Sequence, residues 1–170
     1  VLDMKALQKL SQKLGEHLNH HNLILTTAES CTGGGVSAAI TDIAGSSAWF
    51  DRAFITYSNE AKMEMLGVAE PTLVSHGAVS EETVIEMVQG AIERSNANIG
   101  VSISGIAGPG GGSTEKPVGT VCFAWADEYS WLTVATYHFD GDRADVRQQA
   151  VEVAMKVLYE ELVQRSTYSS

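Results

Sequence analysis

The chain has few cysteines and few basic residues, and it contains no long apolar run. Its two cysteines, Cys31 and Cys122, are too few for a disulfide framework and favour a reducing, cytoplasmic setting. Eleven basic residues stand against 21 acidic ones, for a formal net charge of −10. We therefore expect neither nucleic acid nor an anionic membrane surface as a general partner. A membrane-spanning helix needs a run of about 18 apolar residues, and the sequence has none, so no membrane partner is expected.

The rest of the composition is that of an ordinary globular protein, with 44% hydrophobic and 19% charged residues. A length of 170 residues suits one domain with a full core. No repeat, low-complexity tract or long linker divides the chain. We therefore predict a single domain over residues 1–170.

Hydrophobic periodicity predicts an alternation of helices and strands. Helices are expected near residues 7–21, 36–43, 59–66, 80–92 and 142–163. Strands are expected at residues 23–27, 53–57, 99–104, 120–126 and 132–139, and a loop at 71–77. Parallel βα units come first and an antiparallel pair of strands comes late. We therefore predict an α/β fold, a three-layer α/β/α sandwich with a mixed, mostly parallel five-stranded sheet.

The most informative segment is AESCTGGG, residues 28–35. It joins a predicted strand to an amphipathic helix, which places Ser30 at a strand-to-helix turn, where open α/β sheets bind ligands. The glycines let backbone N–H groups approach a substrate, and the helix points its positive end at the same place. A hydroxyl there can attack a carbonyl while N–H groups stabilise the oxyanion. Two alternatives remain: a helix-capping turn without chemistry, and Cys31 as the nucleophile if a cation lowers its pKa.

Lys62 is the candidate general base. If Asn59 caps the next helix, Lys62 lies in its first turn, where the helix dipole lowers the lysine pKa and burial lowers it further. A lysine with a pKa of about 7–8 can accept a proton from serine. Tyr57, Asn59 and Lys62 follow the second strand as Ser30 follows the first, so neighbouring strands would bring them to one sheet edge. A Ser–Lys pair activates serine without histidine, although a solvated surface lysine is the alternative.

The remaining candidates are weaker. Among the histidines only His76 is kept, and no cysteine–histidine spacing indicates a metal site. The glycine-rich loop 104–113 could present N–H groups to a phosphate, but it matches neither a dinucleotide fingerprint nor a P-loop. Arg143 or Arg147 could bind an anionic group, or could form ordinary ion pairs with neighbouring aspartates.

Five blocks of the sequence together resemble one family. They are AESCTGG (28–34), TYSNEAK (56–62), HGAVS (76–80), SISGIAGP (102–109) and KPVGTV (116–121). In this order, over nearly the whole chain, they resemble the nicotinamide-nucleotide amidase family, which is the CinA carboxy-terminal domain family. Longer competence/damage-inducible proteins carry an additional amino-terminal domain, whereas this chain looks like the stand-alone amidase.

The resemblance implies hydrolysis of nicotinamide mononucleotide to nicotinic acid mononucleotide and ammonia, in pyridine nucleotide salvage. It implies an enzyme without metal or cofactor that forms a homodimer. Ser30 matches the nucleophile, Lys62 the base, and Tyr57 a helper in the proton relay. Residues expected to bind the substrate or its oxyanion are Thr32, Gly33, Gly34, Asn59, Ser104, Gly108, Gly110, Gly111 and Arg143. The alternatives are a nucleotide-binding regulatory module without chemistry, and an amidase or esterase for another small substrate.

Overall fold

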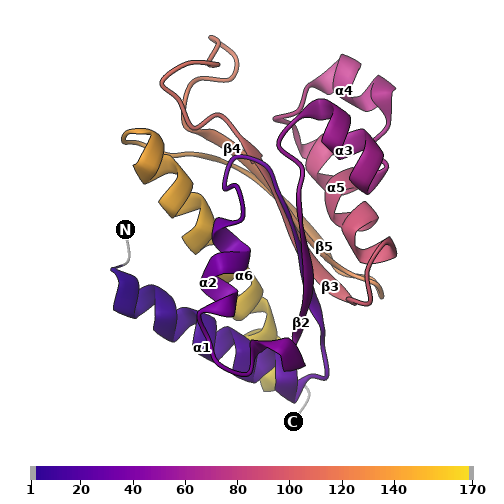
Figure 1. The fold of residues 1–170 in the computed structure, drawn as a ribbon, viewed down its shortest axis with the longest axis vertical. Coiled ribbons are helices and arrows are strands. Elements are labelled where there is room, and N and C mark those ends of the chain that lie inside the picture. The colour runs from indigo at the N-terminus through magenta and orange to yellow at the C-terminus, as the bar shows by residue number, and fades with distance from the viewer. Residues whose placement is uncertain (1–2, 169–170) are drawn as a thin grey trace.

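A five-stranded sheet forms the middle layer of the computed structural model, which describes residues 3–168 (Figure 1). The strands are β1 (Leu25–Glu29), β2 (Phe50–Ile55), β3 (Ile99–Gly105), β4 (Thr120–Asp127) and β5 (Leu132–His138), in the spatial order β2-β1-β3-β4-β5. β1 pairs in parallel with β2 and β3, and β4 pairs antiparallel with β3 and β5. All strands except β4 therefore share one direction, which confirms the predicted mixed, mostly parallel sheet.

Helices cover both faces of this sheet, as Figure 1 shows. One layer holds α1 (Met4–His20), α2 (Gly35–Thr41) and α6 (Arg143–Tyr168); the other holds α3 (Asn59–Leu66), α4 (Glu70–His76) and α5 (Glu81–Glu93). A short 3₁₀ turn, Ser46–Ala48, precedes β2. Each layer has its own apolar cluster against the sheet, so the predicted three-layer sandwich is confirmed. Within residues 3–168, none of the helices is long and apolar enough to cross a bilayer.

Two local predictions next to the site are wrong. Residues 71–77 were expected as a loop, but α4 occupies most of them, because proline is tolerated in the first turn of a helix and Pro71 lies there. The N-cap of α3 is Ser58 rather than Asn59, since the Ser58 side chain accepts a hydrogen bond from the Ala61 N–H. Lys62 is therefore the fourth residue of α3, outside the position where the helix dipole acts most strongly.

The second strand also lies earlier than predicted. β2 ends at Ile55, so Thr56 and Tyr57 follow the strand instead of belonging to it. The Thr56 N–H still donates to the Glu29 carbonyl at 2.8 Å, which keeps the ends of β1 and β2 side by side. Thr56 and Tyr57 then turn away from the sheet toward α3, and this turn places their carbonyls near Lys62.

α3 and α5 touch at Gly90, where the structure leaves no room for a side chain. A Cβ atom at this position would overlap the carbonyl of Leu66. Alanine favours helix by about 1 kcal/mol over glycine, but overpacking of this kind costs about 3 kcal/mol. We therefore expect Gly90→Ala to lower the free energy of unfolding, measured by urea denaturation. Gly110→Ala is the control, because a Cβ there meets nothing within 4 Å, and equal stability losses in both variants would contradict the prediction.

Candidate active site

The ends of β1 and β2 bring a serine and a lysine together. Ser30 follows β1 directly, and Lys62 reaches back from α3, the helix that follows β2. Lys62 Nζ lies 3.0 Å from Ser30 Oγ. The predicted proximity of these two groups is confirmed, and the cause is the expected one: parallel neighbouring strands end at the same sheet edge.

Burial determines the protonation behaviour of Lys62. Its side chain is 1% exposed, and removal from water lowers its pKa from 10.5 to about 8. Nζ also lies 2.9 Å from the Thr56 carbonyl oxygen and 3.2 Å from the Tyr57 carbonyl oxygen. A neutral amine has two N–H donors and one lone pair. It can therefore donate to both carbonyls while its lone pair accepts the proton of Ser30.

Glu29 is a residue of the site that sequence reasoning missed. Its carboxylate is fully buried and accepts hydrogen bonds from the hydroxyls of Thr27 and Thr32 at 3.0 and 2.8 Å. It also accepts from the N–H groups of Val36 and Ser37 in the first turn of α2, at 2.9 and 3.0 Å. The positive end of α2, expected to face the substrate, is thus occupied by Glu29. The acidic residue before Ser30 was visible in the sequence, but its direction was not.

The glycines after Thr32 close the turn. Gly33 and Gly34 have φ values of +59° and +100°, which side chains rarely adopt. The Gly33 N–H donates to the Ser30 carbonyl at 3.0 Å, so this predicted oxyanion donor is used within the turn itself. Thr32 is 1% exposed and lies two residues after Ser30 in the chain. An oxyanion role for these residues stays a prediction.

A cavity of about 240 Å3 opens onto the Ser30–Lys62 pair. Its lining residues are Ser30, Cys31, Tyr57, Lys62, Ala78, Val79, Ser104, Gly105, Ala107 and Arg143. Of the nine residues predicted to bind the substrate or its oxyanion, Ser104 and Arg143 are in this lining. The other seven lie outside it: Thr32, Gly33 and Gly34 in the turn after Ser30, Asn59 at the start of α3, and Gly108, Gly110 and Gly111 in the loop before β4. Gly108 is linked to the cavity through its carbonyl, which accepts from Arg143 Nη1 at 2.8 Å.

Arg143 and Tyr57 stand at the exposed side of this cavity. The phenol of Tyr57 is turned outward, the residue being 64% exposed, and its oxygen lies 3.3 Å from Arg143 Nη2. Only the backbone carbonyl of Tyr57 contacts the Ser30–Lys62 pair. Its role in a proton relay therefore stays a prediction. The Arg143 guanidinium supplies positive charge next to a nucleophile, an arrangement suited to an anionic substrate.

Cys31 is a poor alternative to Ser30. It is 5% exposed, and burial raises the pKa of its thiol to about 11. At neutral pH the sulfur therefore keeps its proton, and a thiol is a weak nucleophile compared with a thiolate.

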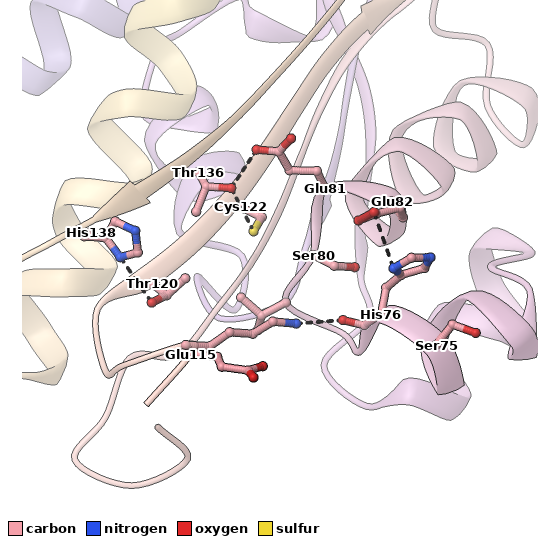
Figure 2. A pocket seen from close by; sticks show the side chains of 12 residues that line it. Ser75, His76, Ser80, Glu81, Glu82, Glu115, Thr120, Cys122, Thr136 and His138 are labelled. Carbon is pink, nitrogen blue, oxygen red and sulfur yellow. Dashed lines mark hydrogen bonds and ion pairs between the residues drawn. The ribbon is translucent and has the colours of Figure 1, made fainter. Parts of the chain in front are cut away.

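His76 belongs to a second and larger cavity, of about 450 Å3, between α4, α5 and the β4–β5 edge (Figure 2). Its Nδ1 lies 3.4 Å from Glu82, and its carbonyl accepts from Lys116 Nζ at 2.6 Å. Figure 2 also shows the Thr136 hydroxyl bonded to Glu81 and lying next to Cys122, whose thiol pKa is raised by burial. Three carboxylates and one lysine line this cavity, a balance unsuited to a phosphate. His76 has no contact with Ser30 or Lys62 among the described interactions.

The Ser30–Lys62 cavity suits nucleophilic attack on a carbonyl. Among residues 3–168 no three histidine, cysteine, aspartate or glutamate side chains gather as a metal site would require. The serine can attack an acyl carbon while the amine accepts its proton. The guanidinium of Arg143, which lines the same cavity, can bind an anionic group.

Known proteins resemble this chain over nearly its whole length. The family model described as CinA C-terminal domain matches residues 7–162. The nicotinamide-nucleotide amidohydrolase PncC of Escherichia coli K12 is 54% identical over 160 residues, which cover 94% of this chain and 97% of that protein. The enzyme of the same name from Pseudomonas putida is 51% identical, with 89% and 94% covered. A CinA-like protein of Syntrophobacter fumaroxidans is 46% identical, and the match covers 92% of this chain but 37% of that longer protein.

Solved structures share the fold. The competence/damage inducible protein CihA from Agrobacterium tumefaciens superposes with a TM-score of 0.87 at 44% identity, covering 89% of this chain and 93% of that one. A CinA superfamily protein from Klebsiella pneumoniae gives a TM-score of 0.89 at 40% identity, with 93% and 98% covered.

Proposed function

Because the chain belongs to the CinA C-terminal domain family, we propose that it is an amidohydrolase that converts nicotinamide mononucleotide and water to nicotinic acid mononucleotide and ammonia, as a step of pyridine nucleotide salvage. The observation that carries the proposal is the 3.0 Å contact between Ser30 Oγ and Lys62 Nζ, whose pKa of about 8 makes it a usable base. Relatives 51–54% identical are named for this activity.

The reaction begins with an attack of Ser30 Oγ on the carboxamide carbon, while Lys62 Nζ takes the hydroxyl proton. The C–O bond forms, the carbonyl becomes an oxyanion, and the C–N bond then breaks as Lys62 returns the proton to the leaving nitrogen. Ammonia departs and an acyl ester remains on Ser30. Water attacks this ester and gives a proton to Lys62. The bond between the acyl carbon and Ser30 Oγ then breaks, Lys62 returns the proton to Oγ, and the acid product leaves, losing its remaining proton to solvent as the carboxylate. Before each attack, hydrogen bonds from the neutral Lys62 amine to the Thr56 and Tyr57 carbonyls hold its lone pair toward Ser30.

The charges around the cavity support one orientation of the substrate. Its carboxamide faces Ser30, and its phosphate faces Arg143, which lines the same cavity. The larger neighbouring cavity carries Glu81, Glu82 and Glu115, so a phosphate would be repelled there. The Gly108 carbonyl holds the Arg143 guanidinium in place at 2.8 Å.

The test is ammonia release from nicotinamide mononucleotide, measured as a function of pH. Lys62 must be neutral to accept a proton, so kcat/KM is expected to rise with pH and to level off above about 8. At pH 7 about a tenth of the molecules would hold the neutral amine, given that pKa. A rate that does not change between pH 6 and pH 9 would contradict Lys62 as the base.

The same assay separates the alternatives. Nucleotide binding without any ammonia release would favour a regulatory module. Faster release from a different small amide, such as nicotinamide riboside without the phosphate, would favour another amidase substrate. The Ser30–Lys62 contact favours catalysis over binding alone. Burial of a lysine lowers the stability of the fold, and a module that only binds a nucleotide does not require a buried lysine beside a serine.

We expect the enzyme to act in the cytoplasm, without nucleic acid, as a homodimer. β5 is consistent with self-association: this edge strand, LTVATYH, has no proline, lysine, aspartate or glutamate to block pairing with another strand. β2, at the other edge, carries Asp51 and Arg52. Light scattering in solution measures the mass, and a monomer at all concentrations would overturn the homodimer.

A further inference from the structure

We propose that Arg147 is a positioning residue that orients the Cys31–Thr32 peptide, so that the Thr32 N–H can stabilise the oxyanion of the attacked carboxamide. The inference rests on the proposed amidase function, and it concerns an arginine that does not line the Ser30–Lys62 cavity.

α6 sends two arginines, one helical turn apart, to different parts of the site. Arg143 lines the cavity and contacts Gly108 and Tyr57. Arg147 instead donates from Nε to the Cys31 carbonyl at 3.0 Å and from Nη2 to the Thr32 carbonyl at 3.3 Å. These two bonds use the planar guanidinium as a fork on two successive peptide groups. Arg147 is therefore bound to the turn after Ser30 instead of being aimed at a substrate.

The direction of these carbonyls decides where the N–H groups point. In a trans peptide the N–H points opposite to the C=O. Because the Cys31 carbonyl faces Arg147, the N–H of Thr32, in the same peptide group, faces away from it. In the described part of the chain this N–H donates no hydrogen bond, although Thr32 is 1% exposed. Buried backbone N–H groups are nearly always paired. Thr32 is outside the cavity lining, but Cys31, which shares the peptide group of this N–H, lines the cavity, so we assign the unpaired N–H to the substrate oxygen.

Thr32 is also held from its other side. Its hydroxyl donates to Glu29 Oε1 at 2.8 Å, while its carbonyl accepts from Arg147. One anchor comes from the end of β1 and the other from α6. A donor held in place before the reaction stabilises an oxyanion without reorganisation, which is the main source of its catalytic effect.

The experiment compares kcat and KM for nicotinamide mononucleotide in Arg147→Met and Arg147→Lys. Loss of an oxyanion donor lowers kcat by about 100-fold, so we expect a kcat loss of that size in Arg147→Met. KM should stay within about threefold, because binding in the ground state does not use the oxyanion donor. Arg147→Lys should recover part of kcat, since an ammonium can donate to one carbonyl. The pH inflection near 8 should persist in both variants, because Lys62 is untouched.

Lys156→Met is the matched control, since it removes an exposed cation from the same helix away from the turn. An unchanged kcat in folded Arg147→Met would overturn the inference. So would a raised KM with normal kcat, which would make Arg147 a substrate-binding group. If Arg147→Met does not fold, Arg147→Lys is the test: a lowered kcat with KM within about threefold supports the inference, and an unchanged kcat overturns it. A wild-type protein that releases no ammonia would instead refute the proposed function.

Discussion

Ser30→Ala is expected to lower kcat/KM for ammonia release from nicotinamide mononucleotide by at least about 10⁴-fold, since loss of the nucleophile removes the covalent route. The fold should persist. Ser30 Oγ contributes only a contact of 3.0 Å to Lys62 Nζ and one of 3.4 Å to the Tyr57 carbonyl. Thermal unfolding followed by circular dichroism measures the fold, and coupled ammonia detection measures the rate.

Cys31→Ala is the control for this prediction, because Cys31 lines the same cavity one residue later. Its thiol has a pKa of about 11 and is protonated at neutral pH, so this variant should keep its activity within about tenfold. The reverse pattern, an active Ser30→Ala and an inactive Cys31→Ala, would assign the attack to sulfur.

Lys62→Met is expected to lower kcat by about 10³-fold or more, since general-base catalysis contributes about 10²–10⁴-fold and Ser30 would also lose its activation. Methionine has a similar length and suits a residue that is 1% exposed. The pH dependence near 8 should disappear together with the activity, because the amine that causes it is gone.

Lys62→Arg separates proton transfer from charge. A guanidinium keeps a positive charge next to Ser30 but holds its proton at every pH of the assay. If Lys62 acts as a base, Lys62→Arg should be about as inactive as Lys62→Met. Substantial activity in a folded Lys62→Arg variant would show that positive charge alone suffices, and the proposed mechanism would be wrong.

Most of the layered fold could be predicted from the sequence. Periodicity places α5 and α6, and the run of β-branched and small residues at β3 indicates a strand buried on both faces, as it is. The predicted ends of helices were wrong where two local sequence signals conflict. Pro71 indicated a loop, yet it opens α4, and Ser58 and Asn59 are both good helix caps. In both places the local signals alone do not decide between the alternatives.

The sequence predicted the Ser30–Lys62 pair on the condition that the first two strands are neighbours, and the parallel pairing of β1 with β2 meets that condition. The surroundings of the pair were not predicted. Glu29 occupies the N-terminus of α2, and Arg147 reaches the turn after Ser30 from 115 residues away along the chain. No sequence pattern predicts these contacts of Glu29 and Arg147, since each depends on the direction in which the side chain points from its strand or helix.

Residue order and hydrophobic spacing were enough to predict the layers and the mixed sheet, and to select Ser30 and Lys62 as the candidate nucleophile and base. The pKa of Lys62, in contrast, is determined by the tertiary structure. It falls to about 8 because the folded chain removes its side chain from water, and desolvation depends on every atom packed around the amine. Charge and hydrogen bonding in the turn after Ser30 depend in the same way on how α6 places Arg147 against that turn, which short-range sequence patterns do not encode.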